Sequence, residues 1–252
     1  MYNFYFNPKV CKHTFVKTFQ MKFYITFILF LLSEMPIKAQ SKQFKLTFKA
    51  TYNQQKLQLD TMQYLLPNNK DYVVVTNFKL YVSNISLLRD GKKVYTEKDS
   101  YHLVDITNDK GLIFTLNIPS TLHFSAIEFN LGIDSATNNK GVLGKDLDPT
   151  KGMYWAWHSG YINLKLEGKS DLCATRNNAF QFHLGGYQYP NNSSQIVTLK
   201  LKNLNKAIIE FDMYKLFEAI DLTTTNEIMT PSNQAVELSK KAASIFKIIN
   251  FE

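Results

Sequence analysis

Alternation of apolar and polar residues dominates the chain beyond residue 40 and predicts many short β-strands. The clearest case is Ser125–Ile133, where apolar residues from Ile127 to Ile133 alternate with polar ones, as in a strand with one buried face. Turn-forming residues separate this strand from the others. The other predicted strands are Gln43–Ala50, Leu57–Asp60, Tyr72–Leu88, Lys93–Tyr95, Tyr101–Ile106, Gly111–Ile118, Met153–Glu167, Ala179–Leu184, Gln195–Leu201 and Ala207–Met213.

Helical periodicity is scarce and falls near the carboxyl end. Met213–Ala219 has room for a turn or two, and Asn233–Ile245 reads as a short helix with Ser232 or Asn233 as its N-cap. A long polar loop, residues 134–151, precedes the Met153 strand, and loops of this length are usually functional or mobile. The pattern predicts an all-β fold, an antiparallel β-sandwich with long loops and a short C-terminal helix.

The first 39 residues differ from the rest in pattern. Phe23–Leu32 is an apolar block that follows Lys22 and precedes Pro36 and Ala39. It is shorter than the roughly 20 residues that span a bilayer, and it matches a secretory signal peptide with cleavage after Ala39. We expect residues 21–39 to be this signal, residues 1–20 to lie upstream of the true start, and residues 40–252 to form one exported domain.

Without this leader the composition changes. The 252-residue chain carries 29 basic and 21 acidic side chains, a net charge of +8, but residues 1–39 hold five lysines and one glutamate, so the exported part has a net charge of +4. This weak excess lacks the basic, aromatic-studded stripe of nucleic-acid binders. Only Cys173 remains as a thiol, which excludes an internal disulfide and favours a small buried hydrophobe. No other segment is apolar enough to span a membrane.

Both tryptophans lie in the predicted strand Met153–Glu167. Apolar residues occupy the even positions from Ile162 to Leu166, so even positions face the core. Extended backwards without a break, this phase turns Trp155 and Trp157 outward and His158 inward. A bulge at Ser159-Gly160 would reverse the assignment, because a glycine inside a strand often marks one inserted residue.

The strand Ala179–Leu184 has its own phase. Phe180, Phe182 and Leu184 alternate inward, so His183 points outward. That is the side on which the unbroken phase places the two tryptophans. If the two strands are neighbours, His183 and one tryptophan lie close enough to form a site.

Four blocks of the chain carry a family resemblance. FKLYVSNISLLRDGK (Phe78–Lys92), FNLGIDSA (Phe129–Ala136), LDPTKGMYWAWHSGYINLKLEG (Leu147–Gly168) and FHLGG (Phe182–Gly186) follow one another in this order. Together they resemble the MbnP family of exported copper-binding proteins associated with methanobactin systems. GMYWAWHSGY followed by FHLGG is the most specific part of the resemblance.

The resemblance implies a periplasmic or secreted β-sandwich that binds one copper ion. In similar proteins the ligands are histidines and a tryptophan oxidised to kynurenine by a partner di-haem enzyme. Transferred to this chain, the candidate metal ligands are His183, His158, Trp155 and Trp157. The pattern differs here because His158 directly follows Trp157, whereas relatives carry a histidine two residues after the modified tryptophan.

Other polar residues have simpler interpretations. His102 and His123 lack ligand spacing and are expected at the surface. Asp134, Asp146 and Asp148 flank the long loop, where carboxylates are usually solvated, although oxygen ligands of this kind also suit calcium.

No motif of a hydrolase, metalloprotease or phosphate-binding enzyme occurs, so we do not expect an enzyme. Two hypotheses follow from the sequence. The first is an exported copper-binding protein that a di-haem partner modifies. The alternative is a metal-free β-sandwich binding module whose outward tryptophans contact a glycan or a protein.

Overall fold

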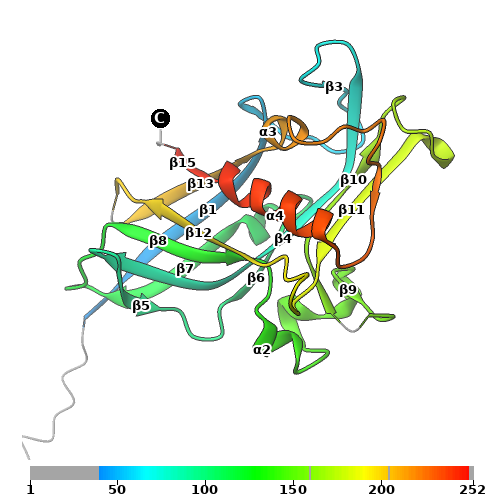
Figure 1. Ribbon diagram of the computed structural model, residues 1–252. Helices are drawn as coiled ribbons and strands as arrows, with labels where there is room; N and C mark the ends of the chain where they lie inside the picture. The colour runs from blue at the N-terminus through cyan, green and yellow to red at the C-terminus, as the bar shows by residue number, and fades with distance from the viewer. Residues whose placement is uncertain (1–39, 159, 204, 250–252) are drawn as a thin grey trace, which may run out of the picture. The chain divides into compact units, whose positions relative to one another are not determined.

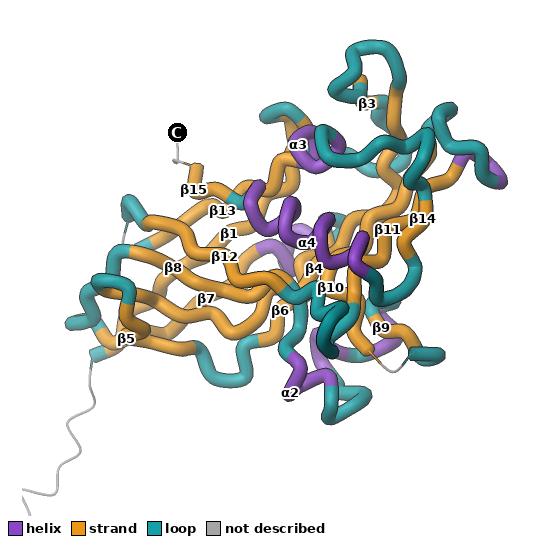
Figure 2. Tube along the Cα trace, in the orientation of Figure 1, coloured by secondary structure: helices purple, strands orange, loops and turns teal. Residues whose placement is uncertain are grey.

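The structure is a computed structural model that describes residues 40–158, 160–203 and 205–249. The expected upstream segment 1–20 and the expected signal 21–39 lie outside the described residues, as does Ser159. The chain divides into two units, Met1–Gln40 and Ser41–Glu252, and the fold below is that of the second. Strands are the main regular structure of this unit, and the helices among the described residues are few and short (Figure 2).

The smaller sheet has five strands in the order β15-β13-β1-β2, with β7 also paired to β1. β13 runs parallel to β1, and the other pairs in this sheet are antiparallel. The strands are β1 (Ser41–Tyr52), β2 (Gln55–Lys56), β7 (Ile113–Pro119), β13 (Lys206–Asp212) and β15 (Lys247–Ile249).

The larger sheet has ten strands, and its central path is β12-β8-β4-β10-β11-β14. β3, β5 and β6 pair with the long strand β4, β9 pairs with β10, and only β11–β14 is parallel among the described pairs of this sheet. The strands are β3 (Tyr64–Leu65), β4 (Tyr72–Arg89), β5 (Lys92–Thr96), β6 (Tyr101–Asp105), β8 (Ala126–Leu131), β9 (Tyr154–Trp155), β10 (Gly160–Lys169), β11 (Ala179–Gly185), β12 (Gln195–Lys200) and β14 (Glu227–Ile228).

The main core lies between the two sheets. Alternate residues of β1, such as Phe48, are buried there and meet the inner face of the larger sheet. The Phe48 ring lies 5.8 Å from Phe129 of β8, and Phe78 of β4 lies 5.2 Å from Phe211 of β13. These contacts between sheets confirm the all-β, sandwich-like fold that the alternation predicts.

The short helices agree with the sequence. α4 covers Asn233–Ile245 as predicted, and Ser232 is its N-cap, because the Ser232 hydroxyl accepts a hydrogen bond from the backbone N–H of Ala235 at 3.1 Å. α3 covers Met213–Phe217. α4 lies across the strands in Figure 1. No helix in the described ranges has the length and apolar character needed to cross a bilayer.

One predicted strand is wrong. Leu57–Asp60 is not a strand, although Leu57 is buried in the main core. The Tyr64 hydroxyl accepts a hydrogen bond from the backbone N–H of Gln58 at 2.7 Å, and Asp60 adopts a positive φ of 63°. The backbone meets its neighbouring strands only at single points, through the N–H of Leu57 to the carbonyl of Ala50 and the N–H of Asp60 to that of Val75. It therefore forms no continuous ladder.

The long polar loop folds into α2 (Ser135–Asn138) and two 3₁₀ turns, η2 (Lys145–Leu147) and η3 (Pro149–Lys151). A second, smaller hydrophobic core includes part of this loop, and the hydroxyl of Tyr81 in β4 donates to the carbonyl of Asp146 at 2.9 Å. The buried members of this second core are Tyr81, Leu103, Ile133, Leu147, Met153, Trp155, Tyr161 and Ile162. Packing in this second core thus holds both the long loop and the segment that carries Trp155.

Candidate functional site

The segment with both tryptophans is a tight hairpin rather than one long strand. Trp155 pairs with Gly160 and Tyr154 with Tyr161, so the chain reverses between β9 and β10. The predicted continuous strand from Met153 to Glu167 is therefore wrong at its start. Among the described residues a register shift between β10 and β11 occurs between Ile162 and Leu164, and it turns Ile162 into the second core.

The reversal gives the two tryptophans different environments. Trp157 is 63% exposed, as its predicted outward position requires. Trp155 lies on the predicted side, that of His183, but it is covered there and only 4% exposed. The two rings lie 5.5 Å apart. Trp155 is buried because its indole lies on Gly185 of β11, where an added Cβ would come within 2.6 Å of Cζ3. Its Nε1 is buried and has no hydrogen-bond partner among the described residues.

His183 lies on the outward face of β11, as predicted, yet it is only 6% exposed. Its Nε2 is 2.7 Å from Oε1 of Glu167 in β10. This hydrogen bond outweighs burial and lowers the pKa of Glu167 to about 2. The pair holds the imidazole ring in one orientation. No hydrogen bond from the described residues reaches Nδ1 of His183. This nitrogen is therefore available to coordinate a metal ion.

His158 is exposed, in contrast to the inward position predicted from an unbroken strand. The turn after Trp155 carries it outward, and its ring lies 6.2 Å from that of Trp155 and 5.4 Å from that of Trp157. It borders a shallow pocket of about 310 Å³ that also involves Tyr187 and Tyr189. Trp155 thus lies between the surroundings of the two histidines. Its ring contacts His158, and it covers Gly185, which shares a strand face with His183.

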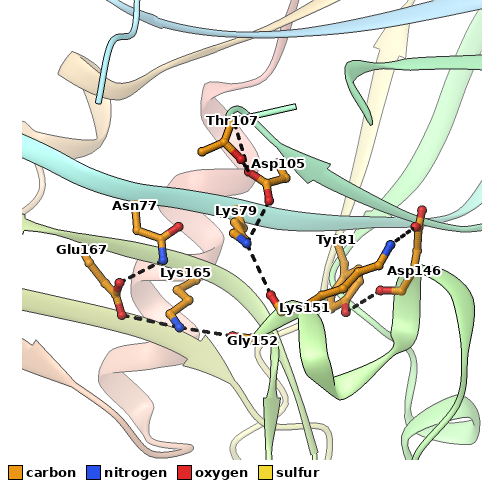
Figure 3. Close-up of polar contacts among 10 residues, drawn as sticks. All are labelled: Asn77, Lys79, Tyr81, Asp105, Thr107, Asp146, Lys151, Gly152, Lys165 and Glu167. Carbon is orange, nitrogen blue, oxygen red and sulfur yellow. Dashed lines mark hydrogen bonds and ion pairs between the residues drawn. The ribbon is translucent and has the colours of Figure 1, made fainter. Parts of the chain in front are cut away.

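A charged network lies beside this aromatic group, between the larger sheet and the long loop (Figure 3). Lys165 and Lys79 face each other on β10 and β4. Each donates to a carbonyl of the loop, Lys165 to Gly152 at 3.1 Å and Lys79 to Lys151 at 3.4 Å. Each ammonium group also forms an ion pair with a carboxylate. The ion pairs are Lys165–Glu167 at 3.5 Å and Lys79–Asp105 at 2.8 Å.

A family model of MbnP matches residues 41–230. The chain belongs to the MbnP family. Its structure is similar to that of MbnP from Methylosinus trichosporium, with a TM-score of 0.59 and 12% sequence identity, over 77% of this chain and 83% of that one. At this identity the similarity concerns the fold alone. Comparison with curated protein sequences gives no match.

Within this MbnP-family domain the loop aspartates have local roles. Asp134 caps α2 by accepting from the N–H of Thr137, and Asp148 caps η3 by accepting from that of Thr150. Asp146 accepts from the N–H of Leu103 and pairs with Lys151 at 2.7 Å. In the described part of the chain no three His, Cys, Asp or Glu side chains lie together as a potential metal site.

The exposure of the other histidines and of the cysteine can be compared with the predictions for this family member. His123 is exposed, as expected. His102 is only partly exposed, because it stacks on Phe114 with ring centroids 4.3 Å apart and bonds Glu97 at 2.7 Å, so its expected surface position is wrong. Cys173 is free and buried in the main core, as its hydrophobic interpretation predicts. Burial also raises the pKa of its thiol.

Three residues that shape the site were not predicted from the sequence: Glu167, Lys165 and Gly185. Lys165 and Glu167 alternate with apolar residues and look like an ordinary solvated strand face. Their contacts with His183 and Gly152 come from other segments. Gly185 was part of the FHLGG block, and the missing side chain was the available signal, since glycine in a strand often allows close approach of another group.

Proposed function

We propose that this MbnP-family protein is exported and binds copper as cargo, through His183, His158 and a ligand formed from Trp155, without being an enzyme itself. The observation that carries the proposal is the position of Trp155. It is the buried tryptophan, its indole N–H has no partner in the part of the chain that the structure describes, and it lies on the strand face of His183. Membership of a family associated with methanobactin systems supports a copper-related role.

The choice of Trp155 over Trp157 rests on chemistry and burial together. An intact indole is a hydrogen-bond donor only and offers no lone pair to a metal. Oxidative cleavage of its C2–C3 bond, followed by hydrolysis that releases C2 as formate, gives kynurenine and leaves an aromatic amine and a ketone in the same place. The proposal assigns this oxidation to a partner di-haem enzyme that supplies the oxidant. Trp157 lies next to it at the surface, 63% exposed.

The histidines suit copper in type, because neutral imidazole is a good copper ligand. In metal sites a ligating histidine usually bonds a carboxylate through its other ring nitrogen. His183 has this arrangement with Glu167 at 2.7 Å. With two imidazoles and one residue derived from Trp155, the proposed donor set does not require a cluster of three His, Cys, Asp or Glu side chains.

The test is the copper content of protein purified from its own host, with intact and peptide masses. We expect close to one copper per chain in the wild type, loss of copper in His183→Ala, and no change in His123→Ala, the control at an exposed histidine. We also expect the peptide with Trp155 to have lost one carbon and gained one oxygen. Copper-free protein that stays empty when offered Cu(I) would contradict the proposal.

The second candidate is a metal-free module that contacts a glycan or protein, and the exposure of Trp157 favours it. Trp157 is 63% and Tyr189 97% exposed, and both flank His158, which borders the pocket described above. Burial of Trp155 leaves one tryptophan for such contacts. Binding to a glycan panel that Trp157→Ala abolishes, in copper-free protein, would favour this candidate.

A further inference from the structure

We propose that Lys165 is a positioning residue that fixes Trp155 and His183 relative to each other. Figure 3 shows the two contacts of Lys165 that carry this inference, one with Gly152 and one with Glu167. The ammonium group of Lys165 donates to the carbonyl of Gly152 at 3.1 Å. It also lies 3.5 Å from Oε1 of Glu167, the oxygen that is 2.7 Å from His183. One side chain therefore holds the tryptophan loop and the partner of the histidine.

Gly152 connects Lys165 to Trp155 through a short stretch of backbone. It ends η3 with a positive φ of 74°, which glycine adopts at little cost. The next residues turn into the second core, where Met153 is fully buried and Trp155 is 4% exposed. A shift of the Gly152 carbonyl would thus move the indole directly.

Glu167 connects Lys165 to His183 on the other side. Its Oε2 accepts a hydrogen bond from the Asn77 side chain at 2.9 Å, while Oε1 is shared by Lys165 and His183. The Lys165 side chain is 16% exposed and that of Glu167 is 21% exposed, so water screens this cluster only partly. Loss of the ammonium group is expected to let Glu167 and the imidazole shift together.

Lys79 provides a matched control. It faces Lys165 across the strands and donates to the neighbouring loop carbonyl of Lys151, but its carboxylate partner is Asp105, not Glu167. Like charges at facing strand positions repel, so both lysines depend on these acceptors. Lys79→Met should remove a contact of the long loop without affecting His183. Lys165→Met should change the positions of both the loop and His183.

The test uses the full chain with Trp157→Phe, produced without the di-haem partner, so that Trp155 keeps its indole and the fluorescence reports Trp155. Methionine keeps the aliphatic stem of lysine, and the exposed Lys169→Met serves as a neutral control. In copper-free protein we expect Lys165→Met to raise acrylamide quenching at least twofold and to shift the ring resonances of His183. Lys79→Met should raise quenching only. Should Lys165→Met fail to fold, Lys165→Gln, which is too short for both acceptors, is measured with the same expectation.

The measurement of copper affinity rests on the proposed function and uses protein from its own host, in which Trp155 carries the proposed modification. We expect Lys165→Met to weaken Cu(I) affinity about tenfold or more, as loss of such supporting groups does. Unchanged quenching and unchanged His183 resonances in a folded variant would overturn the inference, as would identical behaviour of Lys165→Met and Lys79→Met. If the wild type binds no Cu(I) but both copper-free readouts shift, the positioning role stands and the proposed function fails.

Discussion

Single residues acquire their roles here from their partners rather than from their type. His183 and His102 each bond a carboxylate at 2.7 Å, Glu167 and Glu97 respectively. Their other neighbours differ. The His102 ring stacks on Phe114, whereas His183 shares its strand face with Gly185, on which Trp155 lies. The same local pair therefore serves packing in one place and a candidate metal centre in the other.

Glu167→Gln and Glu97→Gln form a matched pair that separates these roles. Both changes weaken a charge-assisted bond to a histidine, so each should lower the free energy of unfolding by about 1.5–3 kcal/mol. Only Glu167→Gln should also weaken Cu(I) binding, by roughly tenfold. Urea unfolding and competition with a Cu(I) chelator measure the two effects. Equal copper affinity in both variants would argue against His183 as a ligand.

At the scale of elements, the site depends on how the β9–β10 hairpin meets β11. β10 pairs with β11 along most of its length, and the register shift between Ile162 and Leu164 falls where Gly185 faces the hairpin. Gly185 leaves space for the Trp155 indole, since a Cβ there would meet ring carbons at 2.6 and 2.8 Å. A strand with a side chain at this position would hold the indole away from His183.

Gly185→Ala tests this contact. The added methyl group overpacks a buried interface, so we expect a loss of about 1–3 kcal/mol in unfolding free energy. In the Trp157→Phe background, with Trp155 unmodified, we also expect the emission of Trp155 to shift to longer wavelength as the indole is displaced. Gly144→Ala is the control, because nothing lies within 4 Å of its added Cβ. A Gly185→Ala protein as stable as Gly144→Ala, with unchanged emission, would show that the indole does not rest on β11.

At the scale of the whole domain, charged side chains fasten the long loop to the outer face of the larger sheet. Lys79 joins β4 to β6 through Asp105 at 2.8 Å and reaches the loop at the carbonyl of Lys151. Burial opposes the charge on Asp105, but hydrogen bonds from Lys79 and Thr107 outweigh it and keep the pKa of Asp105 below its ordinary value of 3.8.

The lowered pKa of Asp105 predicts that part of the free energy of unfolding depends on pH in the acid range. Because the folded pKa is the lower one, Asp105 stabilises the fold above pH 3.8, and this contribution is lost as the pH falls below that value. Asp105→Asn should cost about 1–3 kcal/mol at neutral pH and flatten the dependence of stability on pH in the acid range. Urea unfolding over a pH series measures this.

The control is Asp90→Asn, in the turn between β4 and β5, where the positive φ of 52° suits asparagine. It should retain the acid slope of the wild type. An Asp105→Asn protein that also retains that slope would mean that other carboxylates carry the acid sensitivity.

The sequence by itself determined most of the long strands, the helix Asn233–Ile245 and the sandwich class, because alternation and capping are local signals. It failed at Leu57–Asp60 and at the start of Met153–Glu167. It also identified the family, through the blocks around Trp155 and His183, and the outward face of His183. The match of the family model to residues 41–230 confirms that resemblance. These features depend on residues that lie near one another along the chain.

Only the tertiary structure decided which tryptophan is buried and what surrounds His183. The period-2 phase assumes an unbroken strand, and it fails where Trp155 pairs with Gly160 across a reversal. Glu167, Gly185 and Gly152 meet the site from β10, β11 and the long loop. Such contacts join segments distant in sequence, and their energy depends on packing and desolvation, which no local pattern of residues records.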